Sequence, residues 1–422
     1  MKKVLNLKKV SGLYQAVSSK SYGHRAIIAS SLAKGKSKLL NIDLSEDIVV
    51  TIDAFKSLGV KFFYDSKKRT LDINSKEIGN IKEYKIDMKD SGSSLRFLVP
   101  ILMLFQKDFK VKGSSLLMGR PMDTYFSVFN EKEFSQEVNK EKESVYLVKG
   151  PIKGDTYILS GKKSSQFITG LLFALPLAEE DSYIIIKDEL ESKNYVDMTL
   201  KILKDYGIKY KVKEKSKIKI LGKQSYKERD YIIEGDYSQA SFFFAAAALG
   251  GDLIIKGLTE DSLQGDKEII KILKDMGSVI FKDNNSIIIK KSENLKSLDI
   301  DIKNIPDLAP ILAVLLSFSD GEGSLYNIDR LKYKESNRIK SVISLVNSLG
   351  GEALEKENKI TIKGFKTLKG GEVNSYKDHR IVMAAAIASL RCENPVTING
   401  AEYVNKSYPD FYKDLESIVL KI

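Results

Sequence analysis

Residues 236–248 read DYSQASFFFAAAA, a short polar cluster followed by small and apolar residues, and the chain uses this arrangement six times. The six clusters are marked by Lys20, Gly92, Ser164, Asp236, Asp307 and Asp378, which lie 72, 72, 72, 71 and 71 residues apart. A regular period of this kind indicates one supersecondary unit that is copied and stacked. It also places six helix N-termini in equivalent positions, and helix N-termini attract anions.

Most repeats continue in the same order after the polar cluster. A helix-like apolar stretch is followed by a β-rich piece, an amphipathic helix that ends near glycine, and another β-rich piece. Four of the amphipathic helices end directly before a glycine: 45–58, 195–206, 267–276 and 339–349. Glycine is favoured there because it adopts the left-handed conformation that ends a helix. The alternation of strands and helices predicts the α/β fold class.

The second repeat departs from this order. Residues 131–143 are charged and lose the helix–glycine–strand ending, so we expect an irregular loop there. Residues 211–230 are rich in lysine and precede a strand at 231–234, which makes them the predicted domain junction. Because six repeats divide most simply into two sets of three, we predict two domains. Residues 16–230 would hold repeats one to three, and residues 1–15 plus 231–422 would hold repeats four to six.

The composition fits a globular protein with sizeable cores, since 43% of the 422 residues are hydrophobic. The longest uncharged apolar runs, such as 167–178, fall short of the roughly 18 residues that a membrane span needs. The N-terminal residues lack the apolar region and cleavage site of a signal peptide. A single cysteine, Cys392, and two histidines argue against a disulfide, a zinc site or an iron–sulfur cluster. We therefore expect a cytoplasmic protein with no metal.

The positive net charge of +12 is explained by lysine, but the arginines are more informative. Six of the nine lie in or beside the polar clusters: Arg25, Arg96, Arg120, Arg330, Arg338 and Arg380. Arginine is needed where a planar guanidinium must bind a carboxylate or phosphate through two hydrogen bonds. This distribution predicts a site for anions.

The clusters of the first three repeats combine hydroxyls with cations. Residues 19–25 read SKSYGHR and suit a phosphate, although capping by Ser19 with exposed cations explains them equally well. Residues 90–96 read DSGSSLR, and their small side chains let backbone N–H groups approach a ligand, although such residues also simply begin helices. Residues 164–166 repeat this pattern, and residues 192–195 add a hydroxyl and a phenol.

The clusters of the last three repeats are richer in charge. Asp307 opens repeat five, where a carboxylate is more often a cap than a base. Lys334 and Arg338 are four residues apart and would share one face of a helix, where an anion held between them would relieve their repulsion. A solvated basic face is the alternative for this pair. Residues 378–380 read DHR, and Lys406 follows in NKSYPD at 405–410.

Together these motifs resemble the enolpyruvyl transferase family, and most closely its EPSP synthase branch. Residues 19–25 are similar to the family's Ser-Lys-Ser-x-x-x-Arg segment, residues 90–96 to its Asn/Asp-x-Gly-Thr…Arg segment, and residues 119–122 to its Arg-Pro turn. The remaining matches, in order along essentially the whole chain, are 164–167, 305–307, 334–338, 378–380 and 406–410. The resemblance implies a two-domain inside-out α/β barrel, each domain with three βαβαββ repeats.

The resemblance also implies an activity in the shikimate pathway of aromatic amino acid biosynthesis. The enolpyruvyl group of phosphoenolpyruvate would be transferred to the 5-hydroxyl of shikimate 3-phosphate, with release of phosphate. By matching position, the residues implied to bind shikimate 3-phosphate are Lys20, Ser21, Arg25, Ser164, Ser165, Gln166, Ser192, Tyr195, Asp307 and Lys334. Those implied to bind phosphoenolpyruvate are Lys20, Gly92, Arg120, Gln166, Arg338, Arg380 and Lys406. Arg96 is expected to support its loop.

The chemistry of such a transfer suits these residue types. It proceeds by addition and elimination through a tetrahedral intermediate that expels phosphate. Asp307 is the predicted base for the hydroxyl, and Glu335 or Lys20 the predicted proton donor to the methylene carbon, each transfer giving about 10²–10⁴-fold. Cations around the developing charge add electrostatic stabilisation. No cofactor is required, and binding groups in both halves of the chain imply closure around the substrates.

Two other functions make different predictions from the same residues. A UDP-N-acetylglucosamine enolpyruvyl transferase usually has Lys-Asn in the first cluster and often a catalytic cysteine in repeat two, whereas this chain has Lys20-Ser21 and its cysteine elsewhere. A nucleic-acid-binding repeat protein would carry arginine and aromatic residues along a basic face. We expect a monomer that binds neither nucleic acid nor membranes. Gly92, where glyphosate-insensitive relatives often carry alanine, leads to the hypothesis that glyphosate competes with phosphoenolpyruvate.

Overall fold

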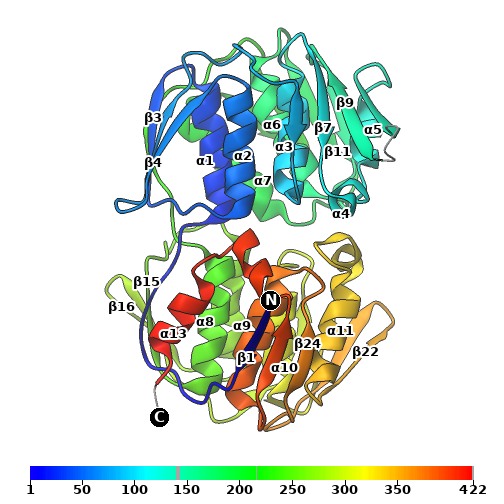
Figure 1. Cartoon of the computed structure of the whole chain (residues 1–422). Coiled ribbons are helices and arrows are strands. Elements are labelled where there is room, and N and C mark those ends of the chain that lie inside the picture. The colour runs from blue at the N-terminus through cyan, green and yellow to red at the C-terminus, as the bar shows by residue number, and fades with distance from the viewer. Residues whose placement is uncertain (139–142, 215, 421–422) are drawn as a thin grey trace. The chain divides into compact units, whose positions relative to one another are not determined.

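The protein, a computed structural model that describes residues 1–138, 143–214 and 216–420, forms two compact units (Figure 1). The central unit is Ser18–Ile233, and the terminal unit combines Met1–Val17 with Glu234–Ile422. Each unit contains three of the six repeats. The predicted domain bounds, 15/16 and 230/231, stay predictions.

The central unit carries repeats one to three. Its helices are α1 Lys20–Leu32, α2 Glu46–Ser57, α3 Gly92–Leu102, α4 Ser115–Met118, α5 Asp123–Val128, α6 Ser165–Ala174, η1 Leu175–Leu177 and α7 Lys193–Asp205. Its strands are β3 Lys36–Leu40, β4 Lys61–Asp65, β5 Thr70–Asn74, β6 Lys85–Asp87, β7 Asp108–Lys112, β8 Phe134–Val138, β9 Ser144–Lys149, β10 Thr156–Leu159, β11 Ser182–Ile186, β12 Tyr210–Lys213, β13 Lys217–Ile220 and β14 Asp230–Ile232.

The terminal unit carries repeats four to six. Its helices are α8 Tyr237–Gly250, η2 Gly265–Glu268, α9 Ile269–Asp275, α10 Ala309–Ser317, η3 Asp329–Tyr333, α11 Arg338–Ser348, α12 His379–Ala388, η4 Ser389–Arg391, η5 Ala401–Lys406 and α13 Phe411–Ile418. Its strands are β1 Lys2–Leu5, β2 Gly12–Gln15, β15 Leu253–Lys256, β16 Ile280–Asp283, β17 Ser286–Ile289, β18 Leu295–Lys296, β19 Asp299–Asp301, β20 Ser319–Asp320, β21 Glu322–Tyr326, β22 Glu352–Lys356, β23 Lys359–Lys363, β24 Gly371–Asn374 and β25 Val396–Asn399.

The sheets repeat one topology. In the order β6-β7-β9-β8, the first pair is parallel and the other two are antiparallel. The sheets β10-β11-β13-β12, β19-β21-β23-β22, β14-β3-β5-β4 and β2-β15-β17-β16 have the same pairing. In repeat six, β1 pairs antiparallel with β25 in place of a hairpin. Each repeat is therefore a βαβα unit that ends in a hairpin or its substitute.

Two strands pair with a repeat that is not their neighbour in the sequence. β2 precedes repeat one in the chain but pairs with β15 of repeat four. β14 precedes repeat four but pairs with β3 of repeat one. Each unit therefore completes its first sheet with a strand from a distant part of the sequence.

The cores lie around the apolar helices that follow the polar clusters. In the terminal unit α8, α10 and α12 pack against one another, and in the central unit α3 packs against α6. Nearly every residue of α8 and every residue of α12 is buried, as expected for helices that are apolar on all sides. In Figure 1 the helices of the central unit run between strands at its edges. Among the described residues, no helix has both the length and the hydropathy to cross a membrane.

The prediction of an irregular loop at 131–143 is wrong for residues 134–138, whereas residues 131–133 form a turn. Residues Phe134–Val138 form β8, which pairs antiparallel with β9. Phe134 is buried against Tyr146 with stacked rings, so one apolar side chain anchors an otherwise polar strand. Residues 139–142 lie outside the described residues.

Candidate active site

The polar clusters begin five of the six repeat helices with a cap from their own side chains. Ser19, Ser91, Ser164, Asp236 and Asp378 each accept a hydrogen bond from a backbone N–H of the first turn. Such caps satisfy donors that have no partner within the helix. The exception is α10, where Leu308 stands at the N-cap position. Asp307 therefore lies one position before the N-cap residue of α10.

Asp307 belongs to an ionic cluster around Arg338, which we call the Asp307 cluster. The Arg338 side chain is 1% exposed, and its guanidinium reaches three carboxylates. Nη1 donates to Asp307 Oδ1 at 2.6 Å, Nη2 to Glu335 Oε2 at 2.5 Å, and Nε to Asp378 Oδ2 at 2.8 Å. The residues of the cluster are Asp307, Lys334, Glu335, Arg338, Asp378 and Arg380.

Lys334 and Arg338 do not share a helix face. Lys334 follows the 3₁₀ helix η3, and α11 begins only at Arg338. The anion between them is Asp307, because Lys334 Nζ donates to Asp307 Oδ1 at 3.1 Å. The alternative of a solvated basic face is wrong as well, since the Lys334 side chain is 21% exposed and that of Arg338 is buried.

The charge of Asp307 is strongly stabilised. Burial alone would raise the pKa of its carboxyl, but Lys334, Arg380 and Arg338 outweigh burial and hold the pKa well below its ordinary value. Burial lowers the pKa of Lys334, and Asp307 opposes that shift. Asp307 is therefore ionised at neutral pH, and only loss of its cationic partners would make it a stronger base.

Arg380 approaches the same carboxylate from α12. Its Nη1 donates to the backbone oxygen of Asp307 at 3.1 Å, and its Nη2 lies 3.6 Å from Asp307 Oδ2. Lys406 is buried at the end of η5, which packs against α12. The terminal unit thus brings five of the predicted site residues together: Asp307, Lys334, Glu335, Arg338 and Arg380. Their binding of substrates stays a prediction.

The central unit has a second group of predicted residues, beginning with Lys20 at the start of α1. Lys20 Nζ donates to Asp47 Oδ2 at 2.6 Å, and the carboxylate belongs to the first turn of α2. The lysine side chain is 18% exposed and the aspartate side chain 6%. Asp47 therefore fixes the ammonium at the edge of the protein interior, where it can still meet a ligand.

Replacing Asp47 with asparagine is expected to weaken binding of both substrates about tenfold, since a hydrogen bond between charged groups is lost. The measurement is KM for each substrate in a phosphate-release assay. Asp53→Asn is the matched control, because Asp53 lies on the same helix in an exposed ion pair with Lys56 at 2.9 Å. Equal effects of the two variants would contradict this role of Asp47.

Arg25 joins α1 to α7. It is buried, so the expectation of exposed cations in the first cluster is wrong for this residue. Its Nε donates to Thr199 Oγ1 at 2.9 Å, Nη1 to Ser21 O at 2.8 Å, and Nη2 to Tyr195 O at 3.0 Å. Burial lowers the pKa of Arg25 to about 10. These contacts bring Ser21, Arg25 and Tyr195 together, and their binding of a substrate stays a prediction.

Gly92 begins α3 beside Arg120. A Cβ at position 92 would lie 2.8 Å from Arg120 Nη1, so glycine allows the guanidinium to approach the helix start. Arg96 Nη1 donates to Gln166 Oε1 at 2.9 Å, while Gln166 Nε2 donates to Ser93 Oγ at 2.9 Å. Arg96 therefore orients Gln166, and its expected support of the loop stays a prediction.

The predicted serines lie at the starts of α6 and α7. Ser164 accepts from the backbone N–H of Gln166 at 3.3 Å, and Ser165 is buried in the next position. Ser192 is at the N-cap of α7 with a φ of 54°. Twelve other non-glycine residues of the described part of the chain also have a positive φ, so this backbone does not mark a ligand site. Binding of a ligand by Ser192 stays a prediction.

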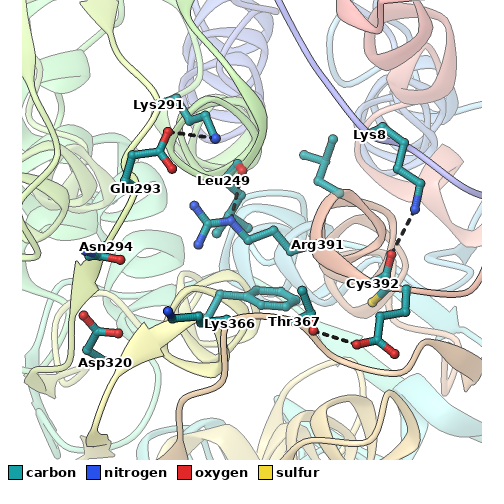
Figure 2. A pocket seen from close by; sticks show the side chains of 13 residues that line it. Lys8, Leu249, Lys291, Glu293, Asn294, Asp320, Lys366, Thr367, Arg391 and Cys392 are labelled. Atoms are coloured by element: carbon teal, nitrogen blue, oxygen red, sulfur yellow. Dashed lines mark hydrogen bonds and ion pairs between the residues drawn. The ribbon is translucent and has the colours of Figure 1, made fainter. Parts of the chain in front are cut away.

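A surface cavity of about 540 Å³ in the terminal unit lies elsewhere (Figure 2). Leu249, Phe318 and Leu390 line it near the C-terminal ends of α8, α10 and α12, whereas Asp307 and Arg380 lie at the opposite helix ends. Figure 2 shows Lys291 paired with Glu293 and Arg391 donating to the backbone of Leu249. The cavity contains none of the predicted site residues.

Sequence reasoning missed two carboxylates that hold the predicted cations. Asp47 gives no local signal beyond an acidic residue in a first helical turn. Asp378 was recognised as the start of repeat six, but its second role, as the partner of Arg338, depends on a residue 40 positions away. Among the described residues, no group of three or more His, Cys, Asp or Glu side chains is placed to hold a metal ion.

The chain is similar to known proteins over nearly its whole length. The family model described as EPSP synthase (3-phosphoshikimate 1-carboxyvinyltransferase) matches residues 5–415. The chain is 44% identical to a 3-phosphoshikimate 1-carboxyvinyltransferase of Clostridium perfringens (strain SM101 / Type A), with 99% of this chain and 98% of that protein covered. It is 43% identical to the enzyme of that name from Clostridioides difficile (strain 630), with 97% and 95% covered.

A solved structure of EPSP synthase from Acinetobacter baumannii matches the fold with a TM-score of 0.82 and 26% identity, over 100% of this chain and 98% of that one. This match confirms the predicted α/β fold of repeated units. With a family match over nearly the whole chain and full-length relatives above 40% identity, the chain belongs to the EPSP synthase (3-phosphoshikimate 1-carboxyvinyltransferase) family.

Proposed function

We propose that the chain transfers the enolpyruvyl group of phosphoenolpyruvate to the 5-hydroxyl of shikimate 3-phosphate and releases phosphate, with the predicted residues of both units as its binding and catalytic groups. The reaction rests on the family match over residues 5–415 and on the full-length relatives. The observation that supports the residue roles is the Asp307 cluster, where one carboxylate meets three cations.

The cations suit two anionic substrates. Phosphoenolpyruvate carries a carboxylate and a phosphate, and Arg120, Arg338, Arg380, Lys20 and Lys406 would bind them together with Gly92 and Gln166. Arg338 presently donates to three carboxylates, so a substrate carboxylate would replace or share one of them. Guanidinium groups suit this exchange because they bind carboxylates with two parallel hydrogen bonds.

Substrate binding would also activate the base. A phosphoenolpyruvate molecule that draws on Arg338 and Arg380 leaves Asp307 with less positive charge around it, so its pKa rises. Asp307 can then accept the proton of the 5-hydroxyl, while Glu335 or Lys20 protonates the methylene carbon. Ser21, Arg25, Ser164, Ser165, Ser192, Tyr195 and Lys334 would hold shikimate 3-phosphate.

The direct test is phosphate release from shikimate 3-phosphate and phosphoenolpyruvate, each omitted in turn. Release that requires both substrates is expected, and no release with both present would overturn the proposal. In the same assay glyphosate is expected to inhibit in competition with phosphoenolpyruvate, because Gly92 leaves space for Arg120 at the helix start. Unchanged activity at high glyphosate would contradict that expectation alone.

We also propose a monomeric enzyme of the cytoplasm, with the central and terminal units as its two domains. The buried apolar residues form two separate clusters, one in each unit, which supports two cores. Sedimentation at several protein concentrations tests the monomer, which a concentration-dependent mass would exclude.

A further inference from the structure

A serine and an aspartate that are not among the predicted site residues form a hydrogen-bonded chain to Arg380. Ser238, in the first turn of α8, accepts a hydrogen bond from Arg380 Nη2 at 2.7 Å. The Ser238 hydroxyl donates in turn to Asp266 Oδ2, in the 3₁₀ helix η2. The contacts therefore run from Asp266 through Ser238 to Arg380, and from Arg380 to the backbone of Asp307.

The direction of these hydrogen bonds follows from chemistry. A guanidinium can only donate, so Ser238 must use a lone pair toward Arg380. The single hydroxyl proton is then free to bind the Asp266 carboxylate. Each partner thus fixes the other, and Arg380 is held from one side by Ser238 and from the other by the Asp307 backbone.

Asp266 is an unusual residue to bury for structural reasons alone. It is 3% exposed and faces one cation, Arg380, and two anions, Asp307 and Asp236. Burial, followed by the charge of Asp307, raises its pKa to about 6. A buried carboxylate with so little compensation costs stability, and such groups gather at functional sites.

Hydrogen bonds of Gln264, at the N-cap of η2, hold this helix in place independently of Asp266. Gln264 Oε1 accepts from the backbone N–H of Tyr237 at 3.1 Å, and Gln264 Nε2 donates to the backbone oxygen of Gly235 at 2.7 Å. The segment is therefore tied to the start of α8 without Asp266, whose carboxylate is left for Ser238 and Arg380.

We propose that Ser238 and Asp266 are positioning residues that orient Arg380 for phosphoenolpyruvate. This inference rests on the proposed function, in which Arg380 binds that substrate. Ser238 fixes one end of the guanidinium, and the charge of Asp266 strengthens the hold. Neither residue contacts the reacting atoms, so their loss changes the affinity for phosphoenolpyruvate more than the chemical step.

The test compares Ser238→Ala, Ser238→Thr, Asp266→Asn and the double variant Ser238→Ala/Asp266→Asn in steady-state kinetics. Ser238→Ala is expected to raise KM for phosphoenolpyruvate about tenfold, and Asp266→Asn about threefold because asparagine still accepts the hydrogen bond. KM for shikimate 3-phosphate stays near the parent value. Threonine restores the parent KM, and the double variant is no worse than Ser238→Ala, since both changes act through Arg380.

Asp299→Asn is the matched control, because Asp299 accepts from Ser324 Oγ at 2.5 Å in the same unit but on β19, away from Arg380. Arg380→Lys tests the substrate-binding role of Arg380 separately from the positioning role of Ser238 and Asp266. If Arg380→Lys leaves KM for phosphoenolpyruvate unchanged, the proposed role of Arg380 is wrong. If Arg380→Lys raises it while Ser238→Ala and Asp266→Asn do not, the positioning role is wrong. Equal rises in both KM values, or a rise in Asp299→Asn, would also overturn it.

Discussion

Asp307→Asn is expected to lower kcat by a factor on the order of 10²–10⁴, the usual contribution of a general base. Asparagine keeps the shape of the side chain and the backbone oxygen that Arg380 uses, but it cannot take the hydroxyl proton. KM for phosphoenolpyruvate stays equal or falls, because Lys334, Arg338 and Arg380 lose a competing anion. Steady-state kinetics with both substrates measure the split between kcat and KM.

Asp329→Asn is the matched control for this experiment. Asp329 lies in the same repeat, in an exposed ion pair with Lys332 at 3.4 Å, and its replacement should leave kcat unchanged. A kcat of Asp307→Asn within a few-fold of the parent would remove Asp307 as the base and return the assignment to another group.

Arg338→Ala is expected to lower the free energy of unfolding by about 3–5 kcal/mol, since it leaves buried carboxylates without their cation. The Asp378 side chain is 0% exposed, and Arg338 is the first of the groups that oppose the effect of burial on its pKa, ahead of His379. Urea denaturation measures the loss. Lys340→Ala, at an exposed position of the same helix, is the control and should change stability little.

The pH dependence of this loss distinguishes charge from packing. In the parent, burial raises the pKa of Asp378 but Arg338 outweighs it, so the folded pKa is depressed. That contribution to stability is present above the unfolded pKa of about 3.9 and is lost as pH falls below it. Without Arg338, the effect of burial dominates, so the pKa of Asp378 in the folded variant rises above its unfolded value. The free energy of unfolding of the variant then increases as pH falls through this raised pKa. The variant should therefore recover part of its loss near about pH 5, whereas a cavity alone would cost the same at every pH.

The helix starts could be predicted from sequence because their signals are local. A capping Ser or Asp precedes small apolar residues, and both features lie within one turn of the element they specify. The glycines at 59, 207, 277 and 350 have positive φ, as expected for residues that end helices. The ends of four helices could therefore also be predicted from the sequence. The same spacing placed Arg338 and Arg380 in one unit.

The contacts within the site could not be predicted in the same way. Asp307 meets Lys334 and Arg338 across 27 and 31 residues, and the sequence spacing of the two cations pointed to a helix face that does not form. Asp266 sits in a short 3₁₀ turn with no periodic pattern, so nothing local marked it. β8 was missed because a single buried aromatic, Phe134, outweighs a polar composition through a partner strand.

The pairing of β2 with β15 and of β14 with β3 determines which unit can fold first during translation. When the ribosome has made residues 18–233, every strand of the central unit's sheets exists, including β14, and that unit can close. The first seventeen residues cannot join a sheet until β15 and β25 emerge, so the earliest residues made are among the last to find their hydrogen-bond partners. A nascent chain of this protein therefore carries an unpaired N-terminal segment through most of its translation.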